Sequence, residues 1–113
     1  MIYPKPKHKK KRKKHGKSIF PQAAGTCYLC MRKGDYSRKY TEVHHIFDGP
    51  NRHISEEQGL TVRLCLKHHR EGKDAVHNNA GNMRILQRDA QEKYEMTHSR
   101  EEFMNLIGKN YLD

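Results

Sequence analysis

The cysteines and one histidine occur in two pairs whose spacing is typical of a metal site. Cys27 and Cys30 are separated by two residues, and Cys65 and His68 repeat this spacing after an interval of 34 residues. Together they supply three cysteines and a histidine, a ligand set of tetrahedral structural zinc. His69 could replace His68, because both fit the spacing. The alternative is three free cysteines; a disulfide framework is disfavoured by their odd number.

Histidine is unusually frequent in the middle of the chain. Six of the nine histidines lie between residues 44 and 77, and the zinc set uses only one of them. Neighbouring strand residues point to opposite sides, so in a strand His44 and His45 could do different work. One could bind a metal while the other faces a substrate, although both could also be ordinary strand residues. The zinc set also leaves His69 and His77 unexplained; His69 could be a zinc ligand or support another ligand, and His77 could be a solvated loop residue.

A short hairpin is predicted to position these histidines. Residues 41–47 (TEVHHIF) are β-branched and apolar, and a turn signal follows at residues 48–51. Alternating apolar residues predict a second strand over 60–65, with a loop over 51–59 between the strands. Residues 66–79 are rich in histidine, charge and glycine, which predicts a loop or a short helical turn.

Two helices are predicted near the C-terminus. Residues 82–96 place apolar side chains three and four positions apart, and an asparagine just before them can cap this helix. Ser99 begins the second helix, where Glu102 completes a capping box and Gly108 is a suitable stop. The predicted fold is therefore small and α+β, and a bound metal would help to hold it together.

Length and composition limit the possible classes of protein. The chain has 113 residues, and 34% are hydrophobic, against about 45–50% in an average globular domain, glycine included. This length predicts one small domain. No apolar run is long enough for a transmembrane helix, and the N-terminus does not resemble a secretory signal. We therefore expect no membrane partner and a cytoplasmic location, in a bacterium or a phage-infected host.

The net charge of +10 is concentrated at the N-terminus. Residues 1–18, here called the basic tail, contain nine of the 23 Lys and Arg residues and no acid, whereas residues 19–113 are nearly neutral. The tail is predicted to be disordered and to attract phosphate without sequence preference. The alternative is a solvated tail that only raises solubility. Its central cations are the candidate nucleic-acid contacts: Lys9, Lys10, Lys11, Arg12, Lys13 and Lys14.

The order of these motifs resembles a known family. The succession CxxC, VHHI and LCxxHH over residues 27–80 is similar to the HNH endonucleases, the ββα-metal or His-Me finger superfamily. Asn51-Arg52, LCLKHH, His77 and the segment 103–111 are also similar to small phage-encoded Ref-like HNH nucleases. The resemblance implies that residues 19–113 form a zinc-stabilised ββα-metal domain. It also implies DNA as the partner, with a recombinase as a possible second partner.

The resemblance implies a role for each histidine of the motif. His44 would bind a catalytic divalent metal and His45 would be the general base. If His68 stands in for the second cysteine of the family's closing motif, His69 would be another metal ligand and His77 the third. The family's asparagine before the second strand is replaced by Gly59-Leu60. Asn51 could orient His45 in its place; Asn78 and Asn79 are other candidates.

The implied chemistry is hydrolysis of a DNA phosphodiester with one metal ion. A neutral histidine can take a proton from water near pH 7, and a divalent ion can stabilise the phosphorane charge. The imidazole ligands suit Zn2+, Ni2+, Mn2+ or Mg2+, in falling order of preference. Arg52 is a candidate phosphate contact.

Two alternatives to an endonuclease remain. The first is a zinc-stabilised nucleic-acid-binding module without catalysis, which the missing asparagine favours. The second is an RNA-associated zinc ribbon, which leaves His44 and His45 without a role. The oligomeric state is not fixed by the sequence.

Overall fold

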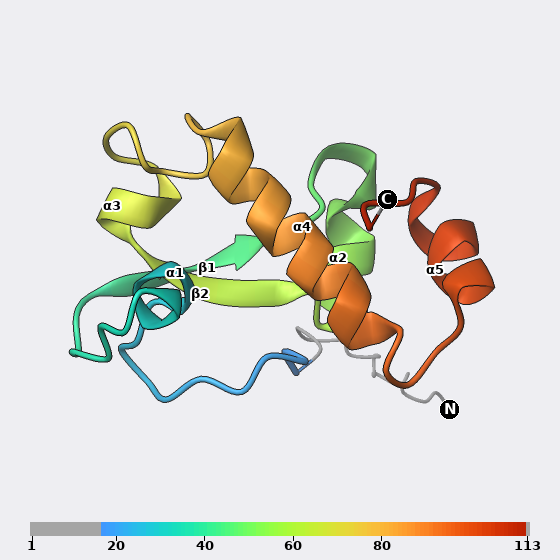
Figure 1. Cartoon of the computed structure of the whole chain (residues 1–113), viewed down its shortest axis with the longest axis horizontal. Helices are drawn as coiled ribbons and strands as arrows, with labels where there is room; N and C mark the ends of the chain where they lie inside the picture. Colours follow the sequence, from blue (N-terminus) through green and yellow to red (C-terminus); the bar gives the residue numbers. More distant parts are fainter. Residues whose placement is uncertain (1–16, 113) are drawn as a thin grey trace, which may run out of the picture.

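The computed structural model describes residues 17–112, which form a two-stranded antiparallel hairpin surrounded by short helices (Figure 1). The six candidate tail contacts, residues 9–14, lie outside the described residues. In chain order the elements are α1 (Tyr28–Arg32), β1 (Thr41–His45), the 3-10 turn η1 (Gly49–Asn51), α2 (Arg52–Gln58), β2 (Thr61–Cys65), α3 (Leu66–His69), α4 (Ala80–Tyr94) and α5 (Arg100–Ile107). The predicted α+β class with a hairpin and C-terminal helices is confirmed.

The hairpin places the two adjacent histidines on opposite sides. β1 pairs with β2 so that His44 is opposite Val62 and His45 is opposite Thr61. His44 is buried, whereas His45 is partly buried. β1 is two residues shorter than predicted, although Ile46 still donates to the Leu60 carbonyl at 3.0 Å.

The prediction of a loop over residues 51–59 is wrong, because most of this segment is helix α2. Its sequence, RHISEEQ, has too few apolar residues to show a helical period. The available signals were the residues that mark the ends of the helix: Pro50 lies just before it and Gly59 ends it. Ser55 attaches α2 to the end of β1, since its hydroxyl donates to the Phe47 carbonyl at 2.7 Å and accepts from the Phe47 amide at 3.0 Å.

The predicted C-terminal helices form, with their caps. Asn79 caps α4 by accepting a hydrogen bond from the Asn82 amide, and Ser99 and Glu102 form the capping box of α5. α4 begins two residues before the predicted segment and also ends two residues earlier. It is the longest helix, with 15 residues, and none of the described helices is long and apolar enough to span a membrane.

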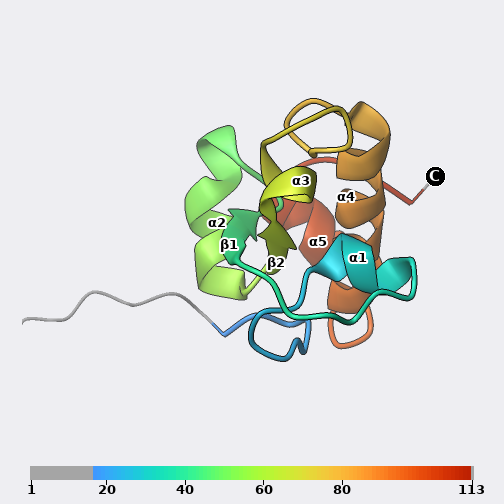
Figure 2. The same cartoon turned by 90° about the vertical axis from the view of Figure 1, so that its left-hand side faces the viewer.

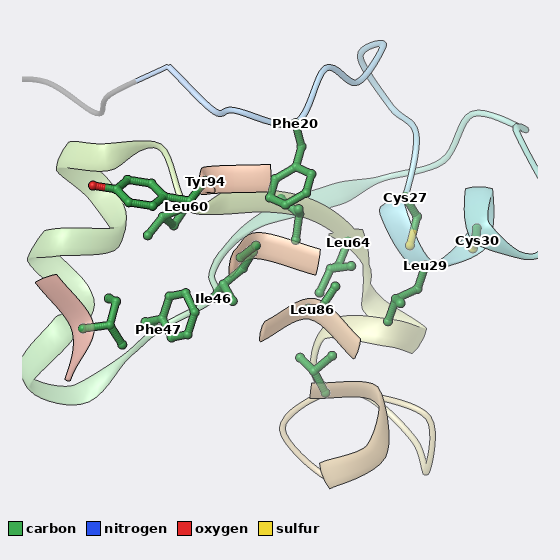
Figure 3. Close-up of a cluster of buried hydrophobic side chains, with 14 of the residues drawn as sticks. Phe20, Cys27, Leu29, Cys30, Ile46, Phe47, Leu60, Leu64, Leu86 and Tyr94 are labelled. Carbon is green, nitrogen blue, oxygen red and sulfur yellow. The ribbon is translucent and has the colours of Figure 1, made fainter. Parts of the chain in front are cut away.

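A single buried cluster joins the helices to the hairpin (Figure 3). Leu86 and Ala90 of α4 are completely buried with Leu64 of β2 and Phe103 of α5. Seen end-on, the hairpin lies between α2 and α4, while α1 and α3 gather at one end of it (Figure 2). The cysteines lie at that end, because β2 leads directly into α3.

The body of the protein includes residues that were predicted to belong to the tail. The Ser18 hydroxyl donates to the Thr61 carbonyl at 2.6 Å, and the Ile19 amide donates to the Gly59 carbonyl at 3.0 Å. Gly59 has φ +74°, and a Cβ added there would clash with the Lys17 carbonyl oxygen. Only glycine therefore fits between α2 and the incoming N-terminal segment.

We expect Gly59→Ala to destabilise the fold more than Gly108→Ala. Both glycines have positive φ, but a Cβ at Gly108 would meet nothing within 4 Å. Gly108→Ala should cost only the left-handed backbone penalty of about 1–2 kcal/mol. Gly59→Ala should cost at least about 1 kcal/mol more, because the Ile19–Gly59 hydrogen bond must shift. Urea unfolding of both zinc-loaded variants measures the difference; equal losses would contradict the close approach.

Candidate metal centres

Four side chains converge at one end of the hairpin with the geometry of a tetrahedral zinc site. The Sγ atoms of Cys30 and Cys65 are 3.8 Å apart. His68 Nδ1 lies 3.4, 3.4 and 3.5 Å from the three sulfurs. Tetrahedral zinc with ordinary bond lengths requires about 3.8 Å between sulfurs and about 3.5 Å from sulfur to nitrogen. These four residues, here called the cysteine cluster (Cys27, Cys30, Cys65, His68), therefore fit a metal such as zinc.

The local fold explains why these four atoms meet. Cys27 is the N-cap of α1, which places Cys30 in the first turn of that helix. Cys65 ends β2 and is the N-cap of α3, which places His68 one turn later. The three cysteines and His68 are all buried, with Cys27 and Cys30 beside Leu29 in Figure 3. All donor positions are filled by protein atoms, which is the pattern of a structural site.

The surroundings favour a bound cation. Burial raises the pKa of the Cys27 thiol to about 11, so a thiolate there is costly without a neighbouring positive charge. Lys39 Nζ lies 3.4 Å from Cys30 Sγ and can donate a hydrogen bond to it. Zinc would supply the remaining charge, and metal binding would then be coupled to folding.

The structure separates the two candidate fourth ligands. His68 belongs to the cysteine cluster, whereas His69 lies in a second group with His44 and His77. The donor atoms of this histidine cluster (His44, His69, His77) are all within 4.8 Å of one another. Their rings stand at 5.1–5.3 Å between centroids. The three residues that the resemblance grouped as ligands of one metal are therefore close together.

One ring nitrogen in the histidine cluster lacks a partner. His44 Nε2 is buried and accepts or donates no hydrogen bond within the described part of the chain. Burial, with the neighbouring His69 and His77, lowers the pKa of His44 to about 3. The ring is therefore neutral at pH 7, as a metal ligand must be. Three imidazoles leave coordination positions open, which is the arrangement of catalytic rather than structural metal sites.

The three histidines are held by different elements. His44 is on β1 and His69 is on α3, while His77, which is exposed, is on the segment between α3 and α4. Backbone and amide hydrogen bonds fix that segment: the Val76 amide donates to the His68 carbonyl at 2.7 Å, and the Asn78 side chain donates to the Gly72 carbonyl at 3.0 Å. Asn78 and Asn79, which were candidates to orient His45, are used in this segment and in the α4 cap.

Glu42 supports the histidine cluster from β1, a contact that the sequence analysis missed. Its Oε1 lies 2.8 Å from His69 Nδ1. Arg70 donates two hydrogen bonds to the same carboxylate, both at 2.9 Å. Arg70 and His69 lower the pKa of Glu42 to about 2. A carboxylate at Nδ1 favours a proton there, which leaves His69 Nε2 as the nitrogen with a lone pair for a metal.

A second carboxylate lies beside His45. Glu56 of α2 places Oε1 3.3 Å from His45 Nε2, within ion-pair range. The Asn51 side chain donates to the Ile107 carbonyl at 3.4 Å. The role of Asn51 in orienting His45 stays a prediction. Arg52 is exposed at the start of α2.

No protein-family model, curated protein or solved structure matches this chain. The family resemblance therefore stays a hypothesis based on the motifs. The case for a function depends on the two clusters and on the side chains around them.

We expect the two clusters to bind metal independently. His68→Ala should lower the zinc content of the purified protein, whereas His69→Ala should leave one zinc per chain. His44→Ala should remove a second, weaker site for Ni2+ or Mn2+ and retain the zinc. Elemental analysis and calorimetric titration measure both quantities. Loss of both metals in every variant would mean that a single site is shared.

We expect Glu42→Ala to weaken metal binding at the histidine cluster by about 10- to 100-fold, because the His69 ring loses its orientation. Calorimetric titration of the zinc-loaded chain with Ni2+ measures the change. Arg70→Ala is the matched control: it removes the ion pair but leaves the Glu42–His69 contact. An equal effect of the two substitutions would show that Glu42 does not act through His69.

Proposed function

We propose that this protein is a metal-dependent DNA endonuclease of the HNH type that hydrolyses phosphodiesters by a one-metal mechanism. The observation that supports this most directly is the histidine cluster, in which the buried His44 nitrogen has no partner within the described part of the chain. His45, the candidate general base, follows His44 in the sequence. An open three-histidine site beside a further histidine fits the requirement for one bound divalent ion and one general base.

In this mechanism His45 takes a proton from the attacking water. When the His45 ring is neutral, the Glu56 carboxylate 3.3 Å from Nε2 would favour the tautomer with its proton on that nitrogen, so that Nδ1 provides the basic lone pair. Glu56 then takes the orienting role that the family assigns to asparagine. As a carboxylate it would also attract the positive charge that the ring acquires on accepting the proton.

His44, His69 and His77 would hold the catalytic divalent ion, with Mg2+, Mn2+, Ni2+ and Zn2+ as candidates. When bound, such an ion stabilises the charge on the phosphorane and on the departing 3′ oxygen. Glu42 would keep the His69 ring in place while the substrate binds. The cysteine cluster has a different task, since it would join α1 to the β2–α3 corner that carries His69.

DNA would be the substrate and the basic tail would supply most of the long-range attraction, because the body is nearly neutral. Arg52 remains a proposed phosphate contact. A protein partner such as a recombinase also remains a proposal, as does a location in the cytoplasm of a bacterium or a phage-infected host.

We expect His45→Ala to abolish nicking of supercoiled plasmid while one zinc per chain and the helical circular dichroism remain. Arg63→Ala, an exposed substitution on β2, is the control and should cleave as the parent does. Each protein is assayed with Mg2+, Mn2+, Ni2+ and Zn2+ in turn. Full nicking by the His45→Ala variant would refute the proposed base.

The same assay tests the alternative, a zinc-stabilised nucleic-acid-binding module without catalysis. No cleavage with any of the four ions, together with salt-sensitive DNA binding, would favour that module over the endonuclease.

A further inference from the structure

The loop between α1 and β1 presents two tyrosines to solvent. Tyr36 is 67% exposed and Tyr40 is 66% exposed, which is unusual for large aromatic side chains. Only two other large hydrophobic residues of the described chain, Val43 and Met96, are classed as exposed. We call residues 33–40 (KGDYSRKY) the tyrosine loop. Its aromatic rings are available for contact with another molecule.

Several hydrogen bonds order the tyrosine loop. Asp35 accepts from the Ser37 amide at 2.9 Å and from the Ser37 hydroxyl at 2.6 Å. The Asp35 amide donates to the Cys30 carbonyl, and the Lys39 amide donates to the Gly25 carbonyl at 2.8 Å. The loop is thus attached to the turn that carries the zinc ligands. A partner that binds there would not have to order it, which lowers the entropic cost of binding.

The charge around the tyrosine loop suits a polyanion. Lys33, Arg38 and Lys67 form no ion pair within residues 17–112 and are exposed. Lys33 and Lys67 line a cavity of about 430 Å³ together with Tyr40. Asp35 and Asp74 also line it, but Asp35 is paired with Lys39 at 3.0 Å. Cations next to exposed aromatic rings are the combination that binds single-stranded nucleic acid.

The tyrosine loop is also connected to the histidine cluster. The Tyr40 hydroxyl donates to Glu42 Oε2 at 3.1 Å, and the other oxygen of that carboxylate lies 2.8 Å from His69 Nδ1. The carboxylate of Glu42 therefore links Tyr40 to the candidate metal ligand His69. A strand whose phosphate occupies the histidine cluster has the Tyr40 ring within reach of a neighbouring nucleotide.

We propose that the tyrosine loop binds unpaired nucleotides next to the phosphate at the histidine cluster. Tyr40 and Tyr36 stack on bases, and Lys33, Arg38 and Lys67 contact the phosphates. Because a tyrosine ring can stack only on a base that has left the duplex, the preferred substrate is DNA with a single-stranded segment. This inference names the substrate class of the proposed endonuclease and rests on that function for the location of the phosphate.

The test measures DNA binding under conditions that suppress the basic tail. Binding of a fluorescent oligo-dT to the full zinc-loaded chain is followed by anisotropy, in the His45→Ala background so that no strand is cut. At about 1 M salt the Debye length is about 3 Å, so the contribution of the tail falls while stacking persists. We expect Tyr36→Ala and Tyr40→Ala each to weaken binding about tenfold. Binding of a duplex of the same length should be unaffected.

Matched variants separate stacking from other effects. Tyr36→Phe and Tyr40→Phe keep the rings and should bind within about twofold of the parent. Met96→Ala removes an equally exposed side chain elsewhere and should have no effect. The chain contains no tryptophan, so quenching of tyrosine fluorescence by the oligonucleotide can be followed, and the part of it that depends on Tyr36 and Tyr40 reports stacking of those rings. That quenching should be lost in the double Phe variant although its affinity is retained.

The outcomes distinguish this inference from the proposed function. Tyrosine-dependent binding of single strands by a chain that cleaves nothing would support the tyrosine loop and refute the endonuclease. Cleavage by the parent, with Ala variants that bind single strands as the Phe variants do, would overturn the tyrosine loop alone. If Tyr40→Ala disturbs Glu42 and lowers the stability, Tyr36→Ala decides, because its side chain makes no described hydrogen bond.

Discussion

The cysteine cluster is the constraint on which the arrangement of the other functional residues depends. It joins α1 to the corner between β2 and α3. Burial disfavours a thiolate at Cys27, whose pKa it raises, and a bound cation would reverse that penalty. Because His68 and His69 are consecutive in α3, fixing His68 in this cluster also fixes where His69 can lie.

The two clusters illustrate how adjacent histidines are directed to different environments. In β1 the period of two sends His44 toward the histidine cluster and His45 toward Glu56. In α3 each residue is rotated by about 100° from the last, which sends His68 to the cysteines and His69 to His44. Two histidine pairs on two elements thus supply side chains to three candidate positions: a structural metal site, a second metal site and a general base. Glu42 contacts the His69 ring at Nδ1, and Arg70 in turn holds the Glu42 carboxylate.

The parts of this arrangement that could be predicted are those with local signals. The spacing of the residues identified the cysteine pairs. The period of the apolar residues identified β2 and α4, and the capping box identified α5. Helix α2 was missed because its polar sequence hides the period, although Pro50 and Gly59 mark its ends. Glu42 and Glu56 could not be foreseen, since their contacts depend on which elements pack together and on the hairpin register. For the same reason the contact of the Asn51 side chain with the Ile107 carbonyl could not be foreseen.

The distribution of charge suggests a division of work between the tail and the body. A cluster of cations attracts phosphate over a distance of about 8–10 Å at ordinary ionic strength but does not read or orient a strand. Orientation requires short-range contacts on ordered structure, and in our proposal the tyrosine loop would provide them. A nearly neutral body then has an advantage, because strong attraction everywhere on its surface would hold DNA in many unproductive positions. Affinity would come mainly from the tail, whereas the choice of strand and phosphate would come from a few ordered side chains.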